Sequence, residues 1–376
     1  MTFSRSRLPS HPKAAASSGE ALAEILAGCW RKEPPPATLE ASQLEKLLSA
    51  LAGSGAGALA WRRLRHSALA KESSVLELQK IYFRQALDAK VQEREIARIL
   101  GLLQGWGIGA LLVKGWATAQ LYPEVGARSV GDIDLLIHRA DKAAAESALG
   151  VKVDDETNSV LDIKSEVPAL YDVRATALFA RSERAALGEI EVRVLGAEDH
   201  LRILCLHFLK HGAWRPSWLC DVAVALESRP ASFDWDLCLG KNPRVSDGIA
   251  CALGLAHHLL GAGVANTPVA SRAARLPAWL VPAVLREWET PQISQHQPAP
   301  LLIESLRERV GARQAVLKRW PNPVQAAMQW KTPLSWPPLP AQTAAFAASS
   351  LHFMKRAPRL LRENSTSTQL GPSKLK

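Results

Sequence analysis

Two aspartates separated by one residue, Asp132 and Asp134, stand at the start of an apolar run that ends at Ile137. In a β-strand the side chains of residues i and i+2 point to the same face, so these carboxylates project together, with Cα atoms about 6–7 Å apart. Adjacent carboxylates repel each other and shift each other's pKa, and a bound divalent cation removes that conflict. Mg²⁺ prefers such oxygen ligands, so the pair predicts half of a metal site on rigid backbone.

An Asp-x-Asp pair alone also occurs at solvated strand ends, but the residues before it favour the metal site. An apolar run from Ile108 to Val113 predicts a first strand that ends at Lys114 and Gly115, with a short helix after it. A glycine where a strand meets a helix lets backbone N–H groups contact a phosphate. Lys114, together with Arg128 and Ser129 in the loop before the aspartates, adds further groups that bind phosphate oxygens.

The same stretch resembles a known family. The residues that carry the resemblance are Lys114-Gly115, Leu121-Tyr122-Pro123, Arg128 and Asp132-Ile133-Asp134-Leu135-Leu136-Ile137. Their combination is similar to the signature of the uncharacterised bacterial nucleotidyltransferase family, within the DNA polymerase beta-like nucleotidyltransferase superfamily. The resemblance covers roughly residues 105 to 240. It implies an α+β fold with a minimal nucleotidyltransferase core, a mixed sheet with flanking helices, that binds a nucleoside triphosphate with Mg²⁺.

A two-metal nucleotidyl transfer requires a third carboxylate near the attacking hydroxyl, as a metal ligand or as a base. Asp162 is our prediction, because it lies in the middle of the alternating segment 160–164, and Glu191 in the segment 189–194 is the alternative. In the family, a histidine and then an aromatic residue usually follow this carboxylate, where the present chain has Lys164 and Ser165. This departure leaves the aspartate pair intact and affects the part of the site that would bind the acceptor. Lys164 is expected to pair with Asp162 or with Glu166.

The remaining chain reads as helical on both sides of this core. The predicted units are a disordered N-terminus (1–18), a helical subdomain (19–105), the nucleotidyltransferase core (106–200), a helical C-terminal domain (201–340), and a basic helix with a flexible tail (341–376). A long helix over 73–104 should bury its apolar stripe against the core. Helical pattern also continues through 234–260.

Three local expectations are more specific. Thr38 is predicted to cap the helix that carries Leu44 and Leu48, and residues 151–153 are predicted to start a strand. The sequence Lys210-His211-Gly212 ends a helix. Its basic side chains either reach the nucleotide or belong to a helix C-cap with glycine in the left-handed conformation.

Composition limits the partners and the compartment. The net charge of +10 favours an acidic partner such as a nucleotide, but no RNA-binding motif is visible, so nucleic acid is not expected. The five cysteines include no C-x-x-C pair, which argues against a disulfide framework or a zinc ribbon. No run of eighteen apolar residues is present. We therefore expect a cytoplasmic protein without a transmembrane segment.

The sequence thus predicts a Mg²⁺-dependent nucleotidyltransferase that moves a nucleoside monophosphate from a nucleoside triphosphate, ATP being the commonest donor, to an unidentified hydroxyl acceptor. The acceptor is a small molecule, a peptide or protein, or an RNA end. Asp132, Asp134 and Asp162 are the predicted catalytic and metal-binding residues. Lys114, Gly115, Arg128 and Ser129 are the predicted phosphate-binding residues. The alternative is a non-catalytic nucleotide-binding or scaffold protein on a degenerate core.

Overall fold

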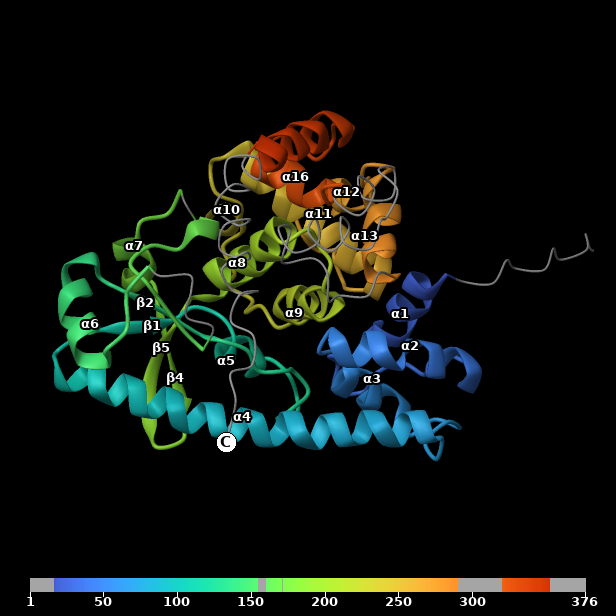
Figure 1. The fold of residues 1–376 in the computed structure, drawn as a ribbon, viewed down its shortest axis with the longest axis horizontal. Helices are drawn as coiled ribbons and strands as arrows, with labels where there is room; N and C mark the ends of the chain where they lie inside the picture. The colour runs from blue at the N-terminus through green and yellow to red at the C-terminus, as the bar shows by residue number, and fades with distance from the viewer. Residues whose placement is uncertain (1–16, 155–159, 171, 290–319, 352–376) are drawn as a thin grey trace, which may run out of the picture.

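The computed structural model describes residues 17–154, 160–170, 172–289 and 320–351. Most of the predicted disordered N-terminus and of the C-terminal tail lies outside these residues. The molecule has three parts in Figure 1: a β-sheet with its helices on the left, a group of C-terminal helices above, and a group of N-terminal helices on the right.

The sheet has five strands, β1 (Ala110–Leu112), β2 (Ile133–Ile137), β3 (Leu161–Lys164), β4 (Glu183–Leu187) and β5 (Ile190–Val194). Their order is β3-β2-β1-β5-β4. β2 and β3 run parallel, β1 and β5 run parallel, and the β1–β2 and β4–β5 pairs are antiparallel. A mixed sheet with flanking helices confirms the predicted α+β class. The hairpin strand β4 was not predicted, because its sequence Glu-Arg-Ala-Ala-Leu lacks the β-branched residues typical of strands.

The N-terminal helices are α1 (Ser18–Leu26), α2 (Ala41–Gly53), α3 (Gly57–Leu64) and α4 (Ser73–Gly105). Ser17 and Glu20 form a capping box at α1. The prediction that Thr38 caps α2 is wrong: Glu40 is the N-cap and forms a capping box with Gln43. The hydroxyl of Thr38 instead donates to the carboxylate of Glu24, so its side chain is used between segments rather than at the helix.

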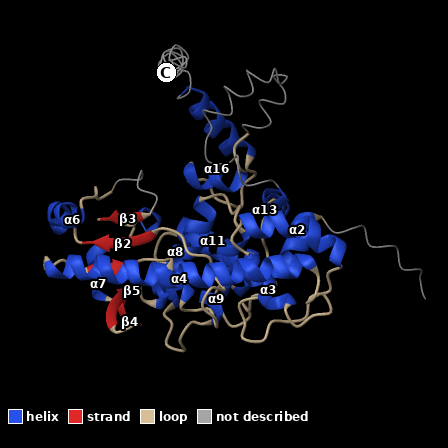
Figure 2. Ribbon diagram, turned by 60° about the horizontal axis from the view of Figure 1, so that its bottom comes forward, coloured by secondary structure: helices blue, strands red, loops and turns tan. Residues whose placement is uncertain are grey.

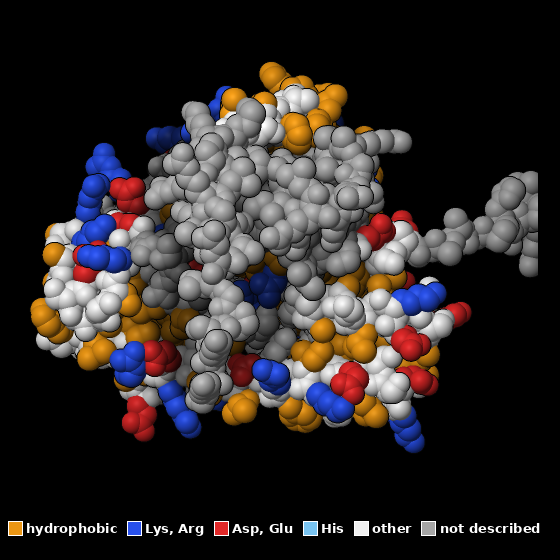
Figure 3. All heavy atoms as spheres, viewed as in Figure 1, with side chains coloured by type: hydrophobic (Ala, Val, Ile, Leu, Met, Phe, Trp, Pro, Cys, Tyr) orange, Lys and Arg blue, Asp and Glu red, His pale blue; other side chains and the backbone are white. Residues whose placement is uncertain are grey.

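Helix α4 is 33 residues long and runs beneath both the sheet and the N-terminal helices (Figures 1 and 2). Its Ile99 and Leu103 are buried against the sheet, as predicted. The expectation that the whole apolar stripe is buried is wrong, because Phe83 and Leu87 are 59% and 65% exposed. The apolar residues of this helix occupy more than one face, and no single neighbour covers them all. Hydrophobic side chains accordingly lie between charged ones along this edge (Figure 3).

Around the strands lie α5 (Trp116–Ala119), α6 (Lys142–Leu149), α7 (Ala175–Ala180) and two 3₁₀ turns, η1 (Arg139–Asp141) and η2 (Pro168–Leu170). The predicted strand over 151–153 is wrong, since this segment is a turn after α6. Val153 is buried there, and its N–H donates to Glu146 Oε1 at 3.0 Å rather than to a strand. The valine pattern therefore reflects burial and not sheet pairing.

The described residues of the C-terminal part form helices joined by loops. This part contains α8 (Ala197–Lys210), α9 (Pro216–Glu227), α10 (Trp235–Leu239), α11 (Pro243–Leu260), α12 (Ala270–Ala273), α13 (Leu280–Glu289) and α16 (Pro323–Gln329), and residues 339–351 are also helical. The helix expected over 234–260 is interrupted. Gly240 has a φ of 65°, and Pro243 begins α11, so glycine and proline separate α10 from α11. None of the described helices combines the length and the apolar character that crossing a bilayer demands.

Each face of β2 belongs to a different core. Ile133, Leu135 and Ile137 join α4 and α6 in one hydrophobic cluster. Leu136 belongs to the other cluster, which extends through α8, α9, α11 and the N-terminal helices. Because side chains alternate along a strand, Asp134 lies on the same face as Leu136. The alternation therefore directs the carboxylate toward the side of the sheet where α8 packs.

A substitution at Gly126 can test how tightly α4 packs against the loop before the aspartates. Gly126 has a φ of 85°, and a Cβ placed there would meet the backbone of Ala86 in α4 at 2.7 Å. Gly150 has a φ of 67° but open space around it. We expect Gly150→Ala to lower the free energy of unfolding by about 1–2 kcal/mol and Gly126→Ala by about 1–3 kcal/mol more, measured by urea denaturation. Equal losses would show that α4 does not constrain this loop.

Candidate active site

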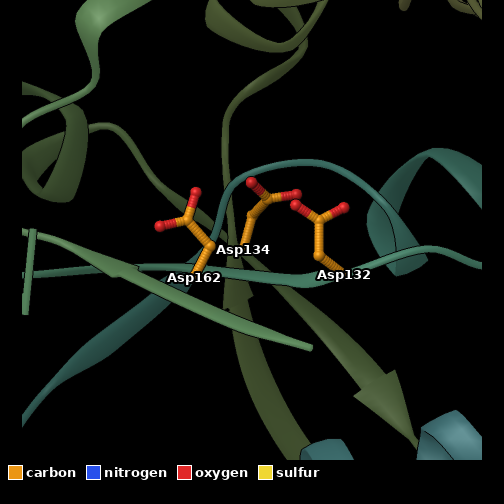
Figure 4. A group of neighbouring side chains, drawn as sticks. All are labelled: Asp132, Asp134 and Asp162. Carbon is orange, nitrogen blue, oxygen red and sulfur yellow. The ribbon is translucent and has the colours of Figure 1, made fainter. Parts of the chain in front are cut away.

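Three carboxylates converge on one side of the sheet. One oxygen from each of Asp132, Asp134 and Asp162 lies within 4.8 Å of the others, and all three side chains project from neighbouring segments of backbone (Figure 4). The three differ in environment, because Asp132 is exposed, Asp134 is 8% exposed and Asp162 is intermediate. The structure therefore brings together the three residues that the sequence predicted as a set.

The pairing of β2 with β3 accounts for this convergence. The strands run parallel, and Asp134 lies directly opposite Asp162. Asp132 precedes β2 by one residue and shares the face of Asp134. Glu191, the alternative third carboxylate, lies on β5 and pairs with Arg184. Strand β1 lies between β2 and β5 in the sheet, so Glu191 is not part of the trio.

Two lysines are bonded to the trio. Lys114 Nζ lies 2.7 Å from Asp134 Oδ1, and Lys164 Nζ lies 2.9 Å from Asp162 Oδ2. Lys164 therefore pairs with Asp162, whereas Glu166 lies 3.6 Å from Arg139. Each ammonium reduces the repulsion between carboxylates that the sheet holds close together.

The charge of Asp134 is nevertheless disfavoured. Burial raises the pKa of Asp134 from 3.8 to about 6, and repulsion by Asp132 and Asp162 acts in the same direction. Lys114 opposes this rise without cancelling it. An ordinary aspartate has no such difficulty at neutral pH, so an additional cation nearby would favour the charged form of this carboxyl.

The chemistry of these donors fits a divalent cation. All are carboxylate oxygens, which hard cations such as Mg²⁺ prefer. Among the described residues, the buried Oδ1 of Asp162 meets no hydrogen-bond donor. A buried acceptor without a partner is costly, and a cation bound to the trio would satisfy it.

Backbone contacts hold the segments beside the trio. Gly115 has a φ of 60° and a ψ of −105°, a conformation that suits glycine, and it leads directly into α5. Gln92 in α4 donates from Nε2 to the carbonyl of Gly131 at 2.7 Å, one residue before Asp132. Helix α4 therefore holds the backbone of the residue before Asp132 in place.

Arg128, a predicted phosphate ligand, lies beside the trio but is itself held by Asp221 in α9. Its Nε donates to both oxygens of Asp221 at 2.9 and 3.0 Å, and the hydroxyl of Tyr122 donates to the same carboxylate at 2.8 Å. Burial disfavours the guanidinium charge, but Asp221 outweighs it and raises the pKa of Arg128, with a smaller contribution from Asp134. Whether its remaining N–H groups bind phosphate stays a prediction.

Arg215 is a residue near the trio that sequence reasoning missed. Its Nε donates to the carbonyl of Ser54 at 2.8 Å, and its Nη2 lies 3.5 Å from the hydroxyl of Ser129. Burial lowers the pKa of Arg215, Arg128 adds to the lowering, and Asp132 opposes it. No signal in the sequence identifies this arginine, because Ser54 is 161 positions away.

The end of α8 confirms the predicted C-cap with glycine in the left-handed conformation. Whether Lys210 or His211 reaches the nucleotide stays a prediction. The N–H of Ala213 donates to the carbonyl of Phe208, and that of Gly212 to Leu209, both at 2.9 Å, with Gly212 at a φ of 82°. These bonds form a Schellman C-cap. One turn earlier, burial lowers the pKa of His207, and Lys114 is the next cause, so α8 also reaches the surroundings of the trio.

A mixed sheet that presents carboxylates from adjacent strands beside basic residues is the arrangement expected of a nucleotidyltransferase. The comparison with protein families agrees: the chain belongs to the uncharacterised nucleotidyltransferase family, whose model matches residues 40–153 and 155–261. The predicted family membership is therefore confirmed. Neither the curated proteins nor the solved structures include a match.

The raised pKa of Asp134 predicts a pH effect on stability. The folded-state value, about 6, lies above the usual 3.8, so the stabilisation is complete below about pH 4 and is lost as pH rises through about 6. Relative to Asp134→Asn, the metal-free wild type should lose about 2 kcal/mol of unfolding free energy between pH 4 and pH 7. Urea denaturation in excess chelator measures this, and a constant difference between the proteins would contradict it.

The Arg128–Asp221 pair predicts a large structural effect. Asp221→Ala leaves a buried guanidinium without its partner and should lower the free energy of unfolding by about 3–5 kcal/mol. The exposed pair of Glu77 and Lys80, whose side chains are 51% and 72% exposed, provides the control. Glu77→Ala should cost less than about 1 kcal/mol. Similar losses in both variants, in thermal or urea denaturation, would argue against a buried ion pair.

Proposed function

We propose that this protein is a Mg²⁺-dependent nucleotidyltransferase that transfers a nucleoside monophosphate from a nucleoside triphosphate to a hydroxyl acceptor, with release of pyrophosphate. The observation that carries the proposal is the carboxylate trio, whose ligand atoms lie within 4.8 Å of one another on adjacent strands. Family membership supports the general reaction. ATP is the preferred donor because it is the commonest.

In this proposal Asp132 and Asp134 hold the metal ions on the triphosphate, and Asp162 is a further ligand or accepts the proton of the acceptor hydroxyl. Bound divalent cations supply charge neutralisation and align the attacking and leaving oxygens. The pairing of β2 with β3 positions two of the carboxylates, because it fixes Asp134 opposite Asp162. Positioning and electrostatic stabilisation account for most of the catalysis in phosphoryl transfer.

The basic residues around the trio are suited to the triphosphate. Lys114 forms an ion pair with Asp134, and Asp134 contributes to the raised pKa of Arg128. Ser129 and the backbone of Gly115 flank them, and Arg215 approaches Ser129. A triphosphate carries several negative charges, and cations in a partly buried site bind it more strongly than they would in water.

The lysine–carboxylate pairs imply an exchange of partners. In the structure Lys114 and Lys164 neutralise Asp134 and Asp162. When the carboxylates bind metal ions, the ammonium groups become available for the phosphates or for the acceptor. In this proposal Lys114, next to Gly115, binds phosphate, and Lys164, two residues after the third carboxylate, serves the acceptor side.

A second candidate function rests on the same lysine. Lys164 occupies a position where the family usually has histidine. Its ammonium group forms an ion pair with Asp162 and would take the place of a metal ion there. The protein would then be a nucleotide-binding or scaffold protein without catalysis. In that case Lys164→His, which shortens the side chain and removes the fixed positive charge, should not create activity.

Transfer of label tests the proposal. Purified protein is incubated with Mg²⁺, ATP labelled in its α-phosphate, and cell extract, and the labelled product is followed. Asp134→Asn, Asp132→Asn and Asp162→Asn should each lower the product by at least about 100-fold, because each removes charge stabilisation at the reacting phosphate. Glu191→Gln removes a carboxylate from the same sheet outside the trio and should leave the product unchanged.

Calorimetry separates the two candidates when no product appears. Binding of Mg²⁺–ATP that is lost in Asp132→Asn, without any transfer by the wild type, supports the nucleotide-binding scaffold. Equal binding by wild type and Asp132→Asn, or transfer that survives in all three aspartate variants, would contradict the proposed site.

A further inference from the structure

A cavity of about 480 Å³ lies between α8, α11 and the segment that begins with α16, three elements that lie together in Figure 1. Its apolar wall includes Leu206 of α8, Val245 of α11, and Met328 and Leu334 of the α16 segment. This volume is within the range of small-molecule sites, which are mostly apolar with a few polar groups. Met328 adds an adaptable surface, because its side chain is flexible and polarisable. We call this space the α8–α16 cavity.

Positive charge predominates among the described residues at the wall of the α8–α16 cavity. Lys210, Arg244 and Lys331 contribute to the lining. The acidic lining residue is Asp247, and its carboxylate lies 3.0 Å from Arg272, which neutralises it. An apolar wall with cationic groups matches a ligand that has an apolar body and an anionic group.

The α8–α16 cavity adjoins the surroundings of the carboxylate trio through two elements. Helix α8 contributes Lys210 to the cavity and, one turn earlier, His207, whose pKa responds to Lys114 beside Asp134. Residues i and i+3 of a helix are neighbours on its surface. The segment after β3 contributes Pro168 to the cavity, four positions beyond Lys164. Two elements near the trio, α8 and the segment after β3, therefore continue into the cavity wall.

We propose that the α8–α16 cavity binds the acceptor, and that the acceptor is an amphipathic organic anion: an apolar body with a carboxylate or another acidic group, and a hydroxyl that reaches the trio. This assignment rests on the proposed function, since only a transferase has an acceptor. The acceptor oxygen forms a bond to the α-phosphorus and the bond from that phosphorus to the bridging oxygen breaks. Pyrophosphate leaves with the electron pair, and the hydroxyl proton passes to Asp162.

The probe is 10-hydroxydecanoate, which combines a carboxylate, an apolar chain and a terminal hydroxyl. Its matched control is 1,10-decanediol, which has the same chain without the charge. We expect calorimetry to show binding of 10-hydroxydecanoate to the wild type, and at least about 10-fold weaker binding of the diol, the change that loss of one charge-assisted contact produces. Absence of 10-hydroxydecanoate binding, or equal affinity for both compounds, would overturn the proposal.

Two cavity variants and one control variant locate the binding site. The double variant Lys210→Glu/Lys331→Glu reverses charge at the α8–α16 cavity and should weaken 10-hydroxydecanoate binding by at least about 10-fold. The double variant Lys241→Glu/Arg275→Glu makes the same change in net charge at exposed residues outside the lining and should bind as the wild type does. Met328→Trp fills the cavity without changing charge and should also weaken binding. Equal binding by all three variants would overturn the assignment.

Nucleotide binding keeps this test separate from the test of the proposed function. Met328→Trp should bind Mg²⁺–ATP as the wild type does, and Asp132→Asn should lose Mg²⁺–ATP while retaining 10-hydroxydecanoate. If the wild type binds Mg²⁺–ATP but not 10-hydroxydecanoate, the proposed role of the cavity is overturned and the proposed transferase function is not. If the wild type binds 10-hydroxydecanoate but not Mg²⁺–ATP, the proposed function is overturned. The acceptor role of the cavity is then overturned with it.

Discussion

Repulsion between three carboxylates on two adjacent strands is the constraint on which the site depends. The sheet does not allow the carboxylates to separate, because the parallel register of β2 and β3 sets Asp134 opposite Asp162 and the strand alternation sets Asp132 on the same face. Burial raises the pKa of Asp134, and repulsion by Asp132 and Asp162 adds to the rise. Two lysines reduce that repulsion in the structure, and divalent cations reduce it further when they bind.

The rest of the fold keeps this arrangement in place. The opposite face of β2 is buried against α4 and α6, so the strand cannot rotate its aspartates away without exposing its apolar residues. Helix α4 also bonds to the carbonyl of Gly131, next to the first aspartate. On the other side, Asp221 of α9 holds Arg128 beside the trio. A large part of the helical extension thus contributes to the geometry and the charge of a small site.

Sequence reasoning found the parts of the site that depend on local periodicity. The spacing of Asp132 and Asp134 predicts their common face, and the alternation around Asp162 predicts a neighbouring strand; both patterns are short and need no partner to be recognised. The α+β class followed from the same patterns together with the resemblance. The roles of these residues as metal and phosphate ligands, and the boundaries of the domains, stay predictions.

The features that sequence reasoning missed depend on contacts between distant segments. Arg215 joins the site through Ser54 and Ser129, which no local pattern connects. The predictions of a fully buried stripe on α4 and of a strand at Val153 were wrong for a related reason. Hydrophobic periodicity indicates that a residue tends to be buried, but not which neighbouring element buries it. Strand β4 pairs only because β5 lies beside it, although its own composition is a poor strand pattern.

The most direct test of the account is the affinity for Mn²⁺, a paramagnetic substitute for Mg²⁺, measured by electron paramagnetic resonance on wild type, Asp134→Asn, Asp162→Asn and Glu191→Gln. If the three aspartates from two strands share a metal centre, the wild type and Glu191→Gln bind Mn²⁺ alike, and each aspartate variant binds it at least about 10-fold more weakly, since one ligand has been removed. Equal affinity in all four proteins would show that the trio does not hold a metal ion.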